Sequence, residues 1–291
     1  MNIGIVGLGL IGASIAKSLK KRTEDRLYVY DRDVEVMKKA NLLNLYDEIL
    51  QEANAGDLDM LVLCLYPKGI IDALSNYVSL LKPGAIVVDC GGTKREIVDK
   101  MHELKKVYPH IDFVGGHPMA GREWSGISHS TAGLFEKSSV LIVPVESDIR
   151  VLYKVKAFFL SIGAERVVLT TSDKHDEMIA YTSQLAHIVS NAYVKSELAP
   201  RHYGYSAGSF RDMTRVAKIN AGMWSELMCE NADYLVEQLE VFEKNIHDIK
   251  LALQSGDREQ LERLLKEGND IKEKVEENRL KKLDETGLKG E

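Results

Sequence analysis

The first 31 residues constrain the fold more than any other part of the chain. An apolar run at residues 3–6 is followed by Gly7-Leu8-Gly9-Leu10-Ile11-Gly12, and residues 13–20 then show a helical pattern. A second apolar run at 27–30 ends on Asp31. Glycines at these three positions permit a tight turn, the approach of a pyrophosphate to the backbone, and close packing of helix on strand. This order of strand, glycine turn, helix, strand and acid is typical of a dinucleotide-binding unit.

The acid at the end of the second strand indicates which dinucleotide binds. Asp31 favours NAD, because a carboxylate accepts hydrogen bonds from the ribose hydroxyls and repels a 2′-phosphate. Arg32 beside it would weaken that repulsion, so NADP stays an alternative. A tight glycine turn that binds no ligand is the structural alternative. The residues that we expect to contact the cofactor are Gly7, Leu8, Gly9, Leu10, Ile11, Gly12, Asp31, Arg32, Tyr66, Pro67 and Thr93.

The remaining apolar runs indicate how the chain is organised. They recur at 60–65, 85–90, 113–115, 140–143 and 166–169, with helical or loop segments between them. Near-continuous apolar strands that alternate with helices predict a mainly parallel sheet covered on both faces. After Thr170 the pattern becomes helical, starting with a long helix from Ser172 toward Pro200. We therefore expect a doubly wound, Rossmann-type α/β domain over residues 1–170 and an all-helical domain over 171–291.

Composition narrows the classes of partner. The net charge of −6 and the pI near 5.8 argue against a nucleic-acid partner. No apolar run is long enough for a membrane span or a signal peptide, so we expect a cytoplasmic protein. Three cysteines show no paired spacing, so no metal is expected. The C-terminal half has more apolar positions than one short helical bundle can bury, which predicts a homodimer through the helical domain.

Three segments carry candidate chemistry: 89–94, 115–126, and 209–215 together with His187. His117, which we expect to leave a short strand into a loop, can accept a proton from an alcohol as hydride leaves the same carbon. A structural histidine is the alternative. Arg215 can bind a carboxylate bidentately, and an ion pair with Asp212 is an equally good interpretation.

At these residues the chain resembles the prephenate and arogenate dehydrogenase family, from the N-terminal fingerprint to about Leu235. The resemblance rests on His117-Pro118-Met119-Ala120-Gly121 with Ser125-Gly126, on Ser183-Gln184-Leu185-Ala186-His187, and on Phe210-Arg211-Asp212-Met213-Thr214-Arg215 with Met223-Trp224. It implies NAD-dependent oxidative decarboxylation of prephenate to 4-hydroxyphenylpyruvate and carbon dioxide, a step of tyrosine biosynthesis.

The resemblance also implies roles for single residues. His117 would take the proton of the ring hydroxyl, Arg215 would bind a substrate carboxylate, and His187 would line the ring pocket. Glu123 would sit at the mouth of that pocket, and Asp212 would orient neighbouring groups. The family commonly has a serine where this chain has Gly92. We expect Thr93 to supply the missing hydroxyl, or else the hydrogen-bond partner of His117 to come from elsewhere.

Three alternatives stay open at this point. Arogenate differs from prephenate only in its side chain, and Arg122 does not decide between them. A β-hydroxyacid dehydrogenase would join similar domains but usually relies on a lysine in the long helix, where this chain has Gln184 and His187. A non-catalytic dinucleotide sensor would need only the glycine fingerprint and a moving interface.

Overall fold

The computed structural model describes residues 1–121 and 124–286, with side chains described as far as residue 281. Eight strands form one sheet in the order β3-β2-β1-β4-β5-β6-β7-β8. Across the described chain all neighbouring strands are parallel except β6 and β7. The strands are β1 Asn2–Val6, β2 Arg26–Tyr30, β3 Glu48–Ile49, β4 Met60–Leu63, β5 Ile86–Asp89, β6 Asp112–Pro118, β7 Ser139–Val145 and β8 Arg166–Leu169.

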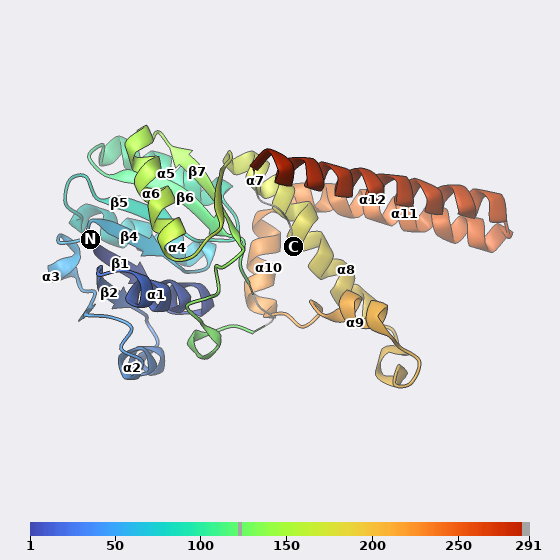
Figure 1. Cartoon of the computed structure of the whole chain (residues 1–291), viewed down its shortest axis with the longest axis horizontal. Helices are drawn as coiled ribbons and strands as arrows, with labels where there is room; N and C mark the ends of the chain where they lie inside the picture. Colours follow the sequence, from blue (N-terminus) through green and yellow to red (C-terminus); the bar gives the residue numbers. More distant parts are fainter. Residues whose placement is uncertain (122–123, 287–291) are drawn as a thin grey trace. The chain divides into compact units, whose positions relative to one another are not determined.

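Helices cover both faces of this sheet (Figure 1). Alternate residues of β4 point to opposite faces of the sheet. Met60 and Val62 belong to the buried cluster on one face, and Leu61 and Leu63 belong to the cluster on the other. The first cluster includes residues of α1 and α6, and the second includes residues of α4 and α5. The helices of this part are α1 Leu10–Arg22, α2 Val34–Leu42, α3 Glu52–Ala55, α4 Pro67–Tyr77, α5 Arg95–Val107 and α6 Ile149–Ser161. The predicted doubly wound, mainly parallel sheet is confirmed.

The strand that carries His117 differs from the sequence prediction. β6 runs to Pro118 instead of ending near residue 115, so His117 lies within the strand and not in the following loop. The reason is its antiparallel pairing with β7, in which His117 stands opposite Leu141. Beyond Val114, β6 pairs with β7 alone, so the ladder with β7 extends the strand past its apolar run.

The helical part begins at Ser172, as predicted, but it is not one regular helix. α7 (Ser172–Ile179) continues through a π-helical segment, Ala180–Leu185, into α8 (Ala186–Tyr193). A short 3₁₀ turn at Ala199–Arg201, α9 (Gly208–Thr214) and α10 (Ala221–Glu230) follow. These helices belong to the same compact unit as the sheet, which spans Met1–Leu235.

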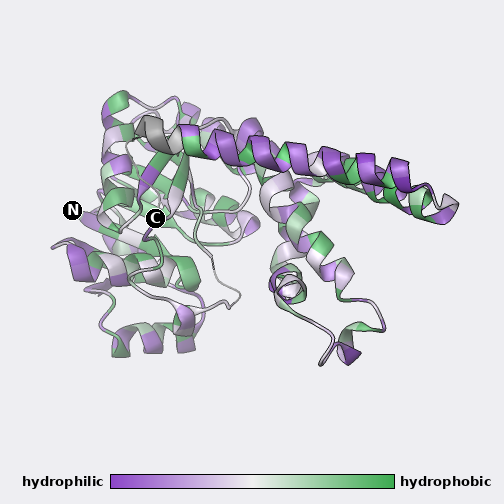
Figure 2. Ribbon diagram, turned by 45° about the vertical axis from the view of Figure 1, so that its right-hand side comes forward, coloured by the Kyte–Doolittle hydropathy of each residue, from purple (hydrophilic) through white to green (hydrophobic). Residues whose placement is uncertain are grey.

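A second compact unit spans Val236–Glu291. It holds most of α11 (Ala232–Ser255) together with α12 (Arg258–Thr286). The two helices lie side by side in both views, and α12 is mainly hydrophilic (Figures 1 and 2). Gly256 joins them in a left-handed conformation that favours glycine at a helix end. Within the described residues, no helix is long and apolar enough to cross a membrane.

Candidate active site

The glycine turn between β1 and α1 has the shape that a dinucleotide pyrophosphate needs. Gly7 adopts a positive φ of 91°, and Cβ atoms at Gly7 and Gly12 would lie closer than 3.0 Å to backbone carbonyl oxygens. A Cβ at Gly9 would meet nothing within 4 Å, so the space beside it is open. No side chain caps the N-terminus of α1, so the first-turn amides can receive an anion. The residues present therefore fit a dinucleotide.

Asp31 lies directly after β2, beside this turn. Its Oδ2 accepts a hydrogen bond of 2.7 Å from the amide of Leu8, and its Oδ1 accepts one of 2.9 Å from the amide of Asp33. The carboxylate is thus fixed by the glycine loop itself. Arg32 is exposed. Contact of either residue with a ribose stays a prediction.

The segments that follow β4 and β5 form hydrogen bonds with α10. Tyr66 is exposed and precedes α4, which begins at the buried Pro67. The amide of Lys68 in the first turn of α4 donates to Glu226 Oε1 at 3.0 Å. The Thr93 hydroxyl, in the turn after β5, donates to Glu230 Oε2 at 2.7 Å. Two carboxylates of α10 thus receive hydrogen bonds from the loops predicted to hold the cofactor.

The position where the family commonly has serine is closely packed. A Cβ at Gly92 would lie 3.0 Å from a methyl carbon of Leu227 in α10. The hydroxyl of Thr93 points to Glu230, so it does not replace that serine as a donor to His117. The Thr93 hydroxyl donates to α10 instead of to His117, and its contact with the cofactor stays a prediction.

The partner of His117 is another histidine. Nδ1 of His117 lies 2.8 Å from Nε2 of His175, and Nδ1 of His175 lies 2.7 Å from Oδ1 of Asp176. Burial lowers the pKa of His117 well below its usual value, and the charge of Lys94 lowers it further. Burial also lowers the pKa of His175. Both rings are therefore neutral near neutral pH.

Asp176 stays ionised although it is buried. Burial alone would raise its pKa, but hydrogen bonds from His175 and from the amides of Arg95 and Lys94 hold the pKa below its usual value. Sequence reasoning missed both His175 and Asp176. The available signal was a histidine next to a carboxylate in the first helix after the sheet domain.

A fully buried ion pair lies beneath this group. Lys94 Nζ pairs with Asp89 Oδ2, and both side chains are shielded from solvent. Asp89 also accepts hydrogen bonds from the amides of Gly91 at 2.8 Å and Gly116 at 3.0 Å. The pair therefore ties the turn after β5 to β6, next to His117.

His187 and Arg215 come together in the helical part. Nδ1 of His187 lies 3.0 Å from the backbone oxygen of Val216, and its ring packs on Trp224 with centroids 3.9 Å apart. Burial lowers the pKa of His187, and the neighbouring charge of Arg215 lowers it further. Arg215 and Asp212 are exposed at the end of α9.

The segment after His117 contacts the residues that follow α9, near His187. The ring of Trp124 stacks on His129 with centroids 5.7 Å apart, and Lys218 Nζ lies 4.7 Å from the centre of the Trp124 ring. Lys218 follows Val216, the partner of His187. Glu123, like Arg122, lies outside the described residues.

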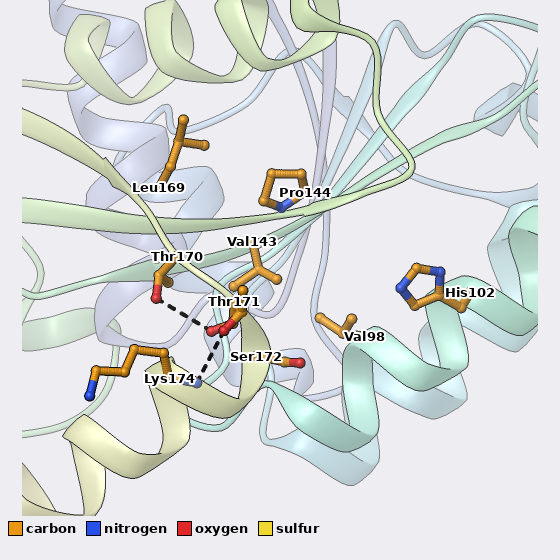
Figure 3. Close-up of a pocket in the computed structure, with 9 residues that line it drawn as sticks. All are labelled: Val98, His102, Val143, Pro144, Leu169, Thr170, Thr171, Ser172 and Lys174. Atoms are coloured by element: carbon orange, nitrogen blue, oxygen red, sulfur yellow. Dashed lines mark hydrogen bonds between the residues drawn. The ribbon is translucent and has the colours of Figure 1, made fainter.

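One open pocket of about 700 Å³ lies elsewhere on this unit (Figure 3). It is lined by Val98, His102, Val143, Pro144, Leu169, Thr170, Thr171, Ser172 and Lys174. None of the predicted site residues lines it. Among the residues that the structure describes, no group of three or more potential ligands is placed to hold a metal ion.

Comparisons with known proteins cover both halves of the chain. Residues 15–169 match the family model described as the prephenate dehydrogenase nucleotide-binding domain, and residues 171–267 match the prephenate dehydrogenase dimerization domain. A prephenate dehydrogenase of Lactococcus lactis is 30% identical over 94% of this chain and 77% of the relative. A cyclohexadienyl dehydrogenase of Zymomonas mobilis is 30% identical over 89% of this chain and 91% of the relative.

Solved structures give the same result. Prephenate dehydrogenase from Aquifex aeolicus, in complex with hydroxyphenyl propionate and NAD⁺, superimposes with a TM-score of 0.82 at 29% identity. That comparison covers 94% of this chain and 98% of the other. Arogenate dehydrogenase from Synechocystis gives a TM-score of 0.78 at 27% identity, covering 94% and 100%.

Proposed function

The chain belongs to the prephenate dehydrogenase family, and from that premise we propose that it oxidises prephenate with NAD⁺ to 4-hydroxyphenylpyruvate and carbon dioxide. The observation that carries this proposal is the position of His117. It is a neutral imidazole at the carboxyl end of β6, the same edge of the sheet at which the glycine turn follows β1. Ligands of open α/β sheets bind at that edge.

The glycine turn and Asp31 are the proposed cofactor site, with Arg32, Tyr66, Pro67 and Thr93 around it. The first-turn amides of α1 would hold the pyrophosphate, and the Asp31 carboxylate would accept hydrogen bonds from the adenosine ribose. When bound, NAD⁺ supplies a hydride acceptor. A carboxylate at this place favours NAD⁺ over NADP⁺.

His117 is the proposed base. Its Nε2 would accept the proton of the substrate ring hydroxyl while the carbon that bears this hydroxyl loses hydride. The bond from the ring to its carboxylate then breaks, carbon dioxide leaves, and the electron pair completes the aromatic ring, while the ring oxygen takes the proton back from His117. Aromatisation makes the step favourable, so the residues mainly have to hold the reacting groups in place.

Residues of the helical part are proposed to bind the rest of the substrate. The guanidinium of Arg215 suits a substrate carboxylate, and His187 would line the ring pocket. Support comes from their closeness, since the charge of Arg215 acts on the His187 ring. Glu123 is proposed at the mouth of the pocket, and Asp212 as a group that orients its neighbours.

We also propose a domain boundary near Thr170 and a cytoplasmic homodimer formed through residues 171–291. The match to a dimerization domain supports the dimer. So do exposed apolar side chains in the helices, at Tyr193, Leu198, Met213, Val236, Val241, Ile246 and Leu251. Sedimentation that gives a monomer at micromolar concentration would contradict this assembly.

The test is NADH formation, followed by ultraviolet absorbance, with prephenate and arogenate in parallel and with NAD⁺ and NADP⁺ in turn. Turnover of prephenate with NAD⁺ supports the proposal. Turnover of arogenate alone would replace the proposed substrate. No turnover of either acid by a protein that binds NAD⁺ would overturn the assigned reaction and favour the sensor.

A further inference from the structure

We propose that His175 and Asp176 are positioning residues that hold His117 in the one tautomer able to act as a base at Nε2. This inference rests on the proposed function, in which Nε2 of His117 receives the substrate proton. The two positioning residues come from the start of α7, whereas His117 comes from β6, 58 positions earlier than His175. Folding therefore brings the three groups together.

The argument starts from Asp176, whose hydrogen-bonding role is fixed. Its Oδ1 lies 2.8 Å from the amide of Lys94, and its Oδ2 lies 2.9 Å from the amide of Arg95. Arg95 Nε adds a third donor at 3.3 Å. An ionised carboxylate surrounded by donors is acceptor-only. Whatever faces it at hydrogen-bond distance must donate.

The proton positions then follow along the chain of contacts. His175 Nδ1, 2.7 Å from Asp176 Oδ1, must carry a proton. A neutral imidazole holds one N–H, so Nε2 of His175 is an acceptor. His117 Nδ1, 2.8 Å from that acceptor, must carry its own ring proton. Nε2 of His117 is left with a lone pair.

That lone pair is available for chemistry. No described residue offers a hydrogen-bond partner to Nε2 of His117, and no polar side-chain atom of the described residues is both fully buried and unpaired. His117 is only partly buried, so a substrate can approach the ring at Nε2, the nitrogen that does not face His175. When it gains a proton, the positive charge faces His175 and, behind it, the Asp176 carboxylate. The opposite tautomer would place a proton on Nε2 and remove the base.

The test compares three single variants with the intact chain. His175→Leu removes the acceptor that fixes His117, so kcat should fall by roughly 10²-fold, within the usual contribution of a general base. The KM for prephenate and the affinity for NADH should stay unchanged. His175→Gln retains an acceptor oxygen for His117 Nδ1 and should recover much of the lost kcat. His102→Gln is the matched control, because His102 also pairs with a carboxylate, 3.1 Å away at Glu146, but lies outside the proposed site.

A second measurement does not depend on turnover or on the folding of the His175 variants. Nitrogen-15 NMR of histidine-labelled, ligand-free protein reports which ring nitrogen carries the proton. The chain has eight histidines, so the His117 resonances are assigned by their loss in His117→Asn. We expect a protonated Nδ1 and an unprotonated Nε2 in His117.

The outcomes separate the inference from the proposed function. A protonated Nε2 in wild-type His117, or wild-type kcat in a folded His175→Leu variant, would overturn the positioning role. Wild-type protein that does not turn over prephenate would overturn the proposed function. In that case the NMR result still decides the tautomer: a protonated Nδ1 supports the inference, and a protonated Nε2 refutes it.

Discussion

Replacing Arg95 should destabilise the protein far more than replacing the carboxylate that forms its shortest hydrogen bonds. Arg95 donates through both Nη atoms to Asp233, at 2.6 and 2.5 Å, and through Nη2 to Asn231 at 3.1 Å. Its Nε reaches Asp176 at 3.3 Å, and its guanidinium lies 4.6 Å from the ring centre of Tyr234. One side chain thus joins the start of α5 to α7 and to the start of α11.

The two carboxylates differ in exposure, and this difference sets the magnitudes. The Asp233 side chain is 58% exposed, whereas that of Asp176 is 2% exposed. Hydrogen bonds from Arg95 lower the pKa of Asp233 from 3.8 to about 2, which corresponds to at most about 2.4 kcal/mol. Solvent screening reduces this to about 1 kcal/mol. Removing one partner of a buried pair costs about 3–5 kcal/mol, and the amides that still bind Asp176 favour the lower end.

Thermal unfolding followed by circular dichroism tests these values. Arg95→Met should lower Tm by roughly 6–12 °C, at 2–4 °C per kcal/mol, and Asp233→Asn by only roughly 2–4 °C. Arg95→Lys should fall between them, because it retains the charge but not the planar fork. The Asp233 contribution is present above pH 3.8 and is lost as the pH falls toward 2. Equal Tm losses in Arg95→Met and Asp233→Asn would refute the assignment of the larger share to the buried carboxylate.

Three further predictions concern the cofactor turn, the base and the buried histidines. Gly9→Ala should keep Tm and weaken NADH binding in a fluorescence titration, because the new methyl group enters the open space beside the turn. Gly12→Ala should lower Tm, because its methyl group would clash with the backbone. Equal Tm in both variants would contradict this. His117→Asn should lower kcat by roughly 10²–10⁴-fold at unchanged KM, and unchanged kcat would exclude His117 as the base. Burial lowers the pKa of both His117 and His175, so the unfolded chain binds more protons than the folded chain. The free energy of urea unfolding should therefore decline as the pH falls below about 6.5. A constant free energy of unfolding across that range would contradict the buried neutral pair.

The sheet domain could be predicted because its signals are local. Strands buried on both faces are nearly all apolar, as in residues 60–63, and the three glycines of the first turn stand at fixed spacing. Each of these patterns lies within a few neighbouring residues. The alternation of strands and helices, the mainly parallel sheet and the dinucleotide turn therefore follow from the sequence, whereas the short strand β3 carries no such signal.

The partners in the site could not be predicted, because they depend on contacts between distant segments. His117 lies inside a strand only because β7 pairs with β6 in the antiparallel direction. Thr93 binds Glu230, 137 positions away, and His175 meets His117 across 58 positions. No periodicity marks such pairs, so the candidate residues could be named while their hydrogen bonds could not.

The π-helical segment between α7 and α8 sets the orientation of His187 relative to His175, so a deletion within it would move these two histidines apart. A π turn holds a residue more than an α-helical turn of the same span, so deleting one residue within Ala180–Leu185 would restore a regular helix. Each residue of an α-helix turns the chain by about 100°. His187 would then rotate away from Val216 while His175 kept its place against β6. A single-codon deletion in this segment should therefore be more damaging than most substitutions there, and the length of the segment should vary less among related chains than its residues do.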